Sequence, residues 1–331
     1  MSRDRFAPWQ QRALQTALSA LAEGRLGHAL LLTGPEQMGK REIARRLAAR
    51  LLCPQPGSDG LACGGCRGCS LLAAGTHPDL LTVGLAVNEN TGKLRSEIVV
   101  EQMRTLSEWF SLTPQLGGAQ VALIEPADAL NASAANALLK TLEEPAAGRY
   151  LLLVTDRPGR LVATLRSRCH RLEFRLPAAD EARAWLAARG HHEPALSQAL
   201  AAARGHPGLA AEWLDGGGLA LREAVRRDLE RLGAGRGQPL ALAQAWLADD
   251  QAALRLRFAA ELVLEGASAG LGAASAGGLT VPADFQKLSD WYDDINRLRE
   301  QLPVPGLRHD LVLAGHLLQW RSLMGKESRR A

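Results

Sequence analysis

The segment Leu30-Leu31-Leu32-Thr33-Gly34-Pro35-Glu36-Gln37-Met38-Gly39-Lys40-Arg41 joins an apolar run to a glycine-containing loop, which leads into a helical pattern. The spacing Gly34-x4-Gly39-Lys40 is that of a phosphate-binding loop, in which backbone N–H groups surround phosphate oxygens and the lysine reaches the terminal phosphates. The positive end of the next helix dipole adds to this. Arg41 stands where the motif requires Ser or Thr to hold Mg²⁺. The segment therefore predicts a nucleotide-binding fold that has lost part of its chemistry.

Length and composition suggest a globular protein with several domains. The 331 residues exceed most single cores and indicate two or three domains, and 47% of them are hydrophobic. A net charge of +4 permits contact with nucleic acid but does not argue for it. The N-terminus lacks the apolar core of a signal peptide, and no run of about 18 apolar residues suggests a membrane span. We therefore expect a cytoplasmic location.

Strand and helix patterns alternate in the first half of the chain. Strands are predicted at 28–33, 80–83, 120–125, 150–155 and 172–174, and helices at 6–24, 40–52, 98–110 and 131–144. This order predicts a parallel sheet covered on both faces. Beyond residue 177 only helices are predicted: short ones over 180–213 and longer ones over 219–331, with the last two at 284–302 and 308–324. The Gly/Ala/Ser-rich segment 266–278 is predicted to be a mobile linker.

Four cysteines follow the phosphate-loop helix in the pattern Cys53-x9-Cys63-x2-Cys66-x2-Cys69. Four thiolates in a glycine-rich turn can enclose tetrahedral Zn²⁺, and a site with no open position is structural rather than catalytic. The alternative is a loop of free cysteines, which such clustering disfavours. His77 could replace one thiolate, but its place before Pro78-Asp79 favours a turn.

The residues that would complete a nucleotide site are only partly present. In a phosphate-loop ATPase, one buried strand ends in Asp, which binds Mg²⁺, and a Glu then activates water. Here the pair is Glu125-Pro126, so the general base is missing. Asp128 is interpreted as a turn or helix-start residue. The candidate nucleotide site therefore consists of Gly34, Gly39, Lys40 and Thr155, with its occupancy by ATP open to doubt.

Two longer motifs resemble the clamp-loader branch of the AAA+ ATPases. They are Asn136-Ala-Leu-Leu-Lys-Thr-Leu-Glu-Glu-Pro145 and Leu161-x3-Leu165-Arg166-Ser167-Arg168-Cys169, and the cysteine module followed by Gly75-Thr76-His77-Pro78-Asp79 adds to the likeness. The resemblance covers nearly the whole chain. It implies an α/β AAA+ domain of the P-loop NTPase type at 1–175, which contains the zinc module (53–69). A small helical lid at 176–213 and an all-α collar domain at 214–331 are implied to follow.

Three departures favour a family member that does not hydrolyse ATP: Arg41, Pro126, and Gly208, which stands where an active member carries a sensor arginine. The alternative is an active clamp-loader ATPase, and the intact Gly34-x4-Gly39-Lys40 leaves nucleotide binding open. The resemblance implies a hetero-pentameric ring with the loader's ATPase and clamp-opening subunits. Through that ring it implies action on the sliding clamp and primed DNA, within the DNA polymerase III holoenzyme.

Arg168 is the candidate catalytic residue, as an arginine finger that acts on a neighbouring subunit's site. Arginine suits this role because its planar, permanently charged guanidinium can hold two phosphate oxygens. The alternative is a surface arginine at a helix end. Cys169 is interpreted as a small buried residue, since no His/Asp pair with catalytic spacing accompanies it.

The apolar positions of the last two helices predict contacts with neighbouring subunits in the collar. On the final helix these positions are Leu311, Ala314, Leu317, Leu318 and Leu323. An internal helical core is an equally good interpretation, because periodicity does not identify the partner of a helix face.

A zinc-dependent nucleic-acid-binding module is a rival function. It is disfavoured because only Arg67 is basic between the cysteines and no aromatic residue there could stack on a base. No paired acidic residues suggest a polymerase or nuclease site, so any polymerase activity is expected to belong to the assembly.

Overall fold

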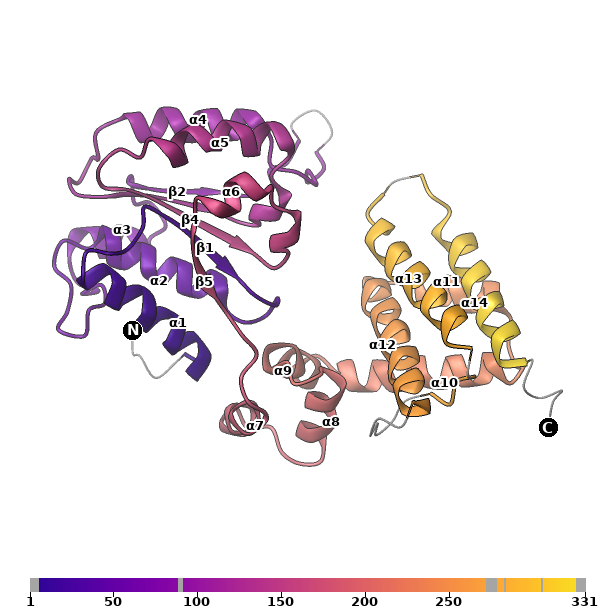
Figure 1. The fold of residues 1–331 in the computed structure, drawn as a ribbon. Coiled ribbons are helices and arrows are strands. Elements are labelled where there is room, and N and C mark those ends of the chain that lie inside the picture. The colour runs from indigo at the N-terminus through magenta and orange to yellow at the C-terminus, as the bar shows by residue number, and fades with distance from the viewer. Residues whose placement is uncertain (1–5, 89–91, 272–278, 283, 305, 326–331) are drawn as a thin grey trace. The chain divides into compact units, whose positions relative to one another are not determined.

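The computed structural model describes residues 6–88, 92–271, 279–282, 284–304 and 306–325 (Figure 1). The chain divides into two compact units, Met1–Ala211 and Glu212–Ala331. The division into three domains, with a separate lid at 176–213, stays a prediction. Among the described helices, none has the length and apolar character needed to cross a bilayer.

The first unit is built on a five-stranded sheet in the order β2-β3-β4-β1-β5, and every pair of neighbouring strands is parallel. The strands are β1 (Ala29–Thr33), β2 (Leu80–Val83), β3 (Gln120–Ile124), β4 (Arg149–Thr155) and β5 (His170–Glu173). Each lies within two residues of the predicted position, so the predicted parallel sheet is confirmed.

Helices cover both faces of this sheet (Figure 1). The helices α1 (Pro8–Ala22), α2 (Lys40–Leu52) and α3 (Arg67–Ala73) lie on one face, and α4 (Val100–Ser111), α5 (Ala132–Glu143) and α6 (Ala163–Ser167) lie on the other. Side chains alternate between the faces of a strand, and β1 follows this rule. Leu30 and Leu32 pack in the core beneath α1 and α2, whereas Leu31 packs in the core beneath α4 and α5. Both cores need apolar residues, which explains the uninterrupted apolar run.

The end of the first unit consists of short helices. These are α7 (Ala179–Ala188), α8 (Ala195–Ala202) and α9 (Pro207–Asp215), and the division between the units falls within α9. Helix α7 is tied to α1 by an ion pair of Arg12 with Glu181 at 2.7 Å and by edge-on packing of Trp9 and Trp185 with ring centroids 5.1 Å apart.

The regular structure of the second unit is all-helical in its described residues, as predicted. It contains α10 (Gly218–Gly233), α11 (Pro239–Trp246), α12 (Ala252–Gly270), α13 (Phe285–Gln301) and α14 (His309–Gly325). Large aromatic side chains fill its interior. The indole of Trp320 donates a hydrogen bond to the carbonyl of Leu229 at 2.9 Å, and that of Trp291 donates to the carbonyl of His316 at 2.8 Å. Buried indole N–H groups need such partners, so these contacts fix how the helices pack.

The final helix corrects one prediction. Leu313, Ala314, Leu317 and Trp320 form its buried face, while Leu311 and Leu318 are 52% and 46% exposed. Thus Ala314 and Leu317 belong to an internal core, and Leu311 and Leu318 lie outside it. The predicted internal core is therefore confirmed for Ala314 and Leu317, and contact of the exposed leucines with another subunit stays a prediction.

The predicted linker at 266–278 is also wrong in its first part. Residues 266–270 form the last turn of α12, and residues 272–278 lie outside the described residues. Gly266 is buried in this turn and packs closely against the backbone of Leu279. A Cβ atom at this position would lie only 2.1 Å from the carbonyl oxygen of Leu279. The glycine is therefore required by close packing and does not signal chain mobility.

This packing predicts that Gly266→Ala destabilises the second unit by about 1–3 kcal/mol, since the backbone contact must open to admit a methyl group. Gly315→Ala is the matched control, because Gly315 is also helical but has open space around its Cβ position. The control should gain roughly 0.5–1 kcal/mol from helix propensity. Urea unfolding followed by tryptophan fluorescence measures both, and equal effects would contradict the prediction.

Candidate functional site

The phosphate loop lies between β1 and α2, as its sequence predicts. Gly39 adopts a left-handed conformation (φ +81°) immediately before α2, and Gly34 also has a positive φ, of +139°. A Cβ atom on Gly34 would lie 2.2 Å from the carbonyl oxygen of Phe174. Both motif glycines are therefore needed for the path of the backbone. The loop keeps the architecture of a nucleotide site.

Lys40 makes its contacts within the protein. Its Nζ donates to the carbonyl of Gly34 at 2.8 Å and to that of Pro35, and it forms an ion pair with Asp156 at 2.5 Å. Its side chain is only 3% exposed. The ammonium that a triphosphate would need is thus neutralised by a carboxylate and covered by the loop. The sequence prediction placed Lys40 at the nucleotide site but missed Asp156. Asp156 directly follows β4, and β4 is the parallel neighbour of β1. An acidic residue at the carboxyl end of a strand next to the phosphate-loop strand is the sequence signal that could have identified it.

Arg41 and Glu125, which both depart from the ATPase pattern, bind each other. Arg41 lies in the first turn of α2, and Glu125 directly follows β3. The Nε of Arg41 donates a hydrogen bond to Oε2 of Glu125 at a distance of 2.5 Å. In an ATPase this position between loop helix and strand end holds Mg²⁺ through a hydroxyl and a carboxylate. Here a guanidinium already neutralises the carboxylate, so Glu125 is not a ready metal ligand.

Thr155 is brought to the same edge of the sheet, but its hydroxyl is engaged. Its Oγ1 donates to Asp128 Oδ1 at 2.6 Å and accepts from the backbone N–H of Arg157 at 3.0 Å. Asp128 lies in a short 3₁₀ turn, Ala127–Ala129, which confirms its interpretation as a turn residue. A nucleotide phosphate would have to displace one of these partners to reach Thr155.

The contact between α9 and the phosphate loop leaves no room for an arginine at position 208. Gly208 lies in the first turn of α9, where a Cβ atom would be 2.0 Å from the carbonyl oxygen of Gln37 in the phosphate loop. Gln37 itself has a positive φ of 63°. The backbone of α9 thus lies directly against the loop. The absence of a sensor arginine has a steric reason, because any side chain at 208 would push helix and loop apart.

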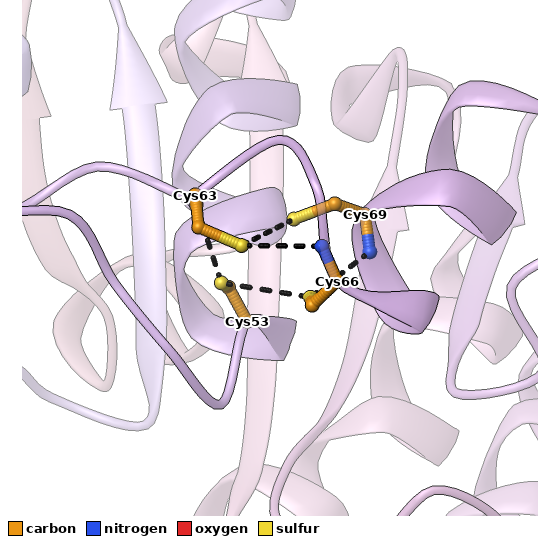
Figure 2. A group of neighbouring side chains, drawn as sticks. All are labelled: Cys53, Cys63, Cys66 and Cys69. Carbon is orange, nitrogen blue, oxygen red and sulfur yellow. Dashed lines mark hydrogen bonds between the residues drawn. The ribbon is translucent and has the colours of Figure 1, made fainter.

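The four cysteines converge as predicted (Figure 2). Their sulfur atoms all lie within 4.8 Å of one another, with the Cys53–Cys66 and Cys63–Cys69 Sγ pairs each 3.9 Å apart. Thiolates at ~2.3 Å from a tetrahedral zinc are about 3.8 Å from one another, so the cluster is close to the size required. Backbone N–H groups of Cys63 and Cys66 donate to the sulfurs of Cys53 and Cys63, both at 3.3 Å. The cluster can hold a metal ion.

The pKa values of two thiols in the cluster are shifted in opposite directions, and a bound cation would favour the thiolate form of both. Backbone N–H groups of Gly65 and Cys66 lower the pKa of Cys63 to about 6, whereas burial raises the pKa of Cys69 to about 12. A metal must therefore displace a proton from Cys69 when it binds, which makes the affinity fall with falling pH.

His77 lies outside this set of ligands. Its Nδ1 accepts a hydrogen bond from the backbone N–H of Asp79 at 3.1 Å, and its burial lowers its pKa despite the nearby Asp79 carboxylate. Its predicted place in a turn is confirmed. The carboxylate of Asp79 in turn accepts from the backbone N–H groups of Gln115 and Leu116 at 2.8 and 2.9 Å. The Gly75–Asp79 motif therefore anchors the loop before β3.

Arg168 lies immediately after α6, far along the chain from the loop residues. Its Nη2 forms an ion pair with Glu143 Oε1 at 2.6 Å, its Nη1 donates to the carbonyl of Thr164 at 3.0 Å, and its side chain is 37% exposed. Cys169 beside it is 8% exposed, and burial raises its pKa to about 11. Its interpretation as an inert buried residue agrees with this. The sequence analysis missed Glu143 as the partner of Arg168.

These features define an α/β protein of the AAA+ type, with a phosphate loop whose ionic groups are paired internally. A family model described as DNA polymerase III, delta subunit, matches residues 9–178. DNA polymerase III subunit delta' of Pseudomonas aeruginosa is 37% identical over 96% of this chain and 98% of the relative, and that of Escherichia coli K12 is 34% identical over 95% of each. The chain belongs to this delta' family.

Two further comparisons delimit the assignment. Subunit tau of Salmonella typhimurium is 37% identical, but the match covers 52% of this chain and 25% of tau. The crystal structure of a DNA polymerase III gamma subunit-related protein from Thermotoga maritima matches with a TM-score of 0.52 over 94% of this chain and 99% of that one, at 18% identity. The partial tau match favours the delta' assignment over an active ATPase, and the Thermotoga structure supports the fold.

The cysteine geometry predicts that Cys66→Ser lowers the metal content of the purified protein and the stability of the segment around it. Removing a thiolate from a closed site weakens metal binding, which contributes directly to folding. Cys169→Ser is the matched control and should leave the metal content unchanged, because Cys169 is remote from the cluster in the sheet core. Elemental analysis measures the metal. Protein purified without chelators that contains no metal would contradict the prediction.

Proposed function

We propose that this chain is the delta' subunit of a clamp loader, which helps to load the sliding clamp onto primed DNA without hydrolysing ATP itself. It would assemble in a hetero-pentameric ring with the tau or gamma ATPase subunit and the delta subunit of DNA polymerase III. The observation that carries the proposal is the Arg41–Glu125 ion pair, because it occupies the metal-binding position of a phosphate-loop ATPase.

The other contacts of the loop support the same conclusion. Pro126 offers no carboxylate to activate water, and general-base catalysis typically contributes about 10²–10⁴ in rate. Lys40 is paired with Asp156, and the close contact of Gly208 with Gln37 holds the lid helix against the loop. Binding of a triphosphate at Gly34, Gly39, Lys40 and Thr155 would have to break several of these contacts, so nucleotide binding at this site is expected to be weak.

We assign Arg168 the role of an arginine finger for the neighbouring ATPase subunit. Its own subunit lacks a working base, so its charge can assist hydrolysis only in another active site. The guanidinium is partly exposed and lies on the opposite face of the sheet from the cysteine cluster. A guanidinium that meets the charge on a transferring phosphoryl group contributes roughly 10³–10⁵ in rate where this is known.

We assign Zn²⁺ to Cys53, Cys63, Cys66 and Cys69, as a structural ion. Four thiolates in tetrahedral arrangement prefer zinc among the common divalent ions, and they leave no position for a substrate. The ion would supply folding free energy to the segment between α2 and β2. We also assign the all-helical second unit to the collar that joins the subunits of the ring, with Leu311 and Leu318 of α14 as exposed apolar contacts.

The internal pairing of the loop predicts that the isolated chain does not turn over ATP, with or without primed DNA. Lys40→Ala provides the control, since it removes the ammonium of the loop and reports any contaminating ATPase. Phosphate release should be the same for both proteins. DNA-stimulated release by the natural chain that disappears in Lys40→Ala would contradict the proposal.

We expect that Arg168→Ala leaves assembly of the reconstituted loader intact. It should slow ATP hydrolysis and clamp loading by at least about tenfold, a lower limit set below the roughly 10³–10⁵ that such arginines contribute to the rate. Arg175→Ala is the matched control, because Arg175 is a more exposed arginine that pairs with Glu173 at the end of β5. Native mass spectrometry checks assembly. Unchanged turnover in an intact complex would show that Arg168 has no catalytic part.

A further inference from the structure

The backbone that carries Arg168 is fixed by the core on both sides. Leu165, three residues before it, is fully buried, and Cys169 directly after it is 8% exposed. Both belong to the hydrophobic cluster that contains Leu138 and Leu142 of α5. The Cα position of Arg168 is therefore set by α5 and the sheet, and only the orientation of its long side chain needs a further constraint.

Glu143 supplies that constraint. Its carboxylate holds Nη2 of Arg168 at 2.6 Å, while the carbonyl of Thr164 holds Nη1 at 3.0 Å. Both terminal nitrogens are thus anchored, on two different helices. The guanidinium has more N–H donors than these two contacts use, so it can still form a two-pronged contact with phosphate oxygens.

The position of Glu143 also points to a role outside helix stability. It is the last residue of α5, where the negative end of the helix dipole disfavours a carboxylate. Pairing with Arg168 offsets this unfavourable charge. The pair is half-exposed, so its contribution to global stability is small, and its main consequence is the fixed orientation of Arg168.

We propose that Glu143 is a positioning residue, which orients the Arg168 guanidinium before it meets the triphosphate bound by the neighbouring ATPase subunit. This inference rests on the proposed function of Arg168. Arginine carries a large side-chain conformational entropy, and a guanidinium that is already oriented loses less of it when the phosphate contact forms. The carboxylate thereby favours the reactive arrangement without touching the nucleotide.

Glu143→Gln tests the proposal in the reconstituted loader, because it removes the charge and keeps the size of the side chain. Turnover at saturating ATP should fall about 2- to 5-fold, the effect that loss of an exposed ion pair produces. The KM for ATP should stay the same, since the neighbour binds the nucleotide with its own loop. Glu144→Gln is the matched control, with the same charge change one residue further along, and should have no effect.

The double variant separates positioning from a general structural effect. In the Arg168→Ala background, Glu143→Gln should cause no further loss, because the two residues act as one unit. An additive loss, or a rise in turnover for Glu143→Gln alone, would overturn the proposal. If Arg168→Ala slows the loader but Glu143→Gln does not, only the positioning role fails. If Arg168→Ala has no effect, the proposed function of Arg168 fails as well.

Discussion

The parallel arrangement of the sheet is the constraint from which the site follows. Because all paired strands run in the same direction, the carboxyl ends of β1, β3 and β4 meet at one edge. The phosphate loop, Glu125, Thr155 and Asp156 therefore lie close together although they are far apart in sequence. In a phosphate-loop ATPase the nucleotide and Mg²⁺ fill this edge. In this chain the same edge is filled by contacts between the protein's own groups.

In these contacts, the charged and polar side chains of the site are paired with one another. Lys40 pairs with Asp156, Arg41 pairs with Glu125, and the hydroxyl of Thr155 is bound by Asp128. Each of these three side chains, which in an ATPase would stand near a phosphate or metal, therefore has an internal partner. An unpaired ammonium at 3% exposure would be costly, so the ion pair with Asp156 explains how the Lys40 side chain is accommodated in the buried loop. The fold thus keeps the loop as a structural element.

The cysteine cluster and Arg168 lie away from the edge of the sheet that carries the phosphate loop. The cysteine cluster joins α2 to α3 on one face of the sheet, and Arg168 follows α6 on the other face. Both depend on rigid surroundings: the cluster is organised by backbone N–H bonds to sulfur, and Arg168 is held by buried neighbours and Glu143. These fixed surroundings support the proposal that the chain presents Arg168 to a neighbouring subunit.

The sequence by itself determined the features that depend on local pattern and spacing. The apolar run before Gly34 predicted β1, Asn131 marked the start of α5, and the Cys-x2-Cys steps predicted the cluster, because each depends on residues near one another in the chain. Only the tertiary structure decided the rest. It selected Asp156 and Glu143 as partners of Lys40 and Arg168, and it brought Gly208 against Gln37. It also extended α12 through Gly266 and exposed Leu311, since the partner of a side chain or helix face is chosen by packing between segments distant in sequence.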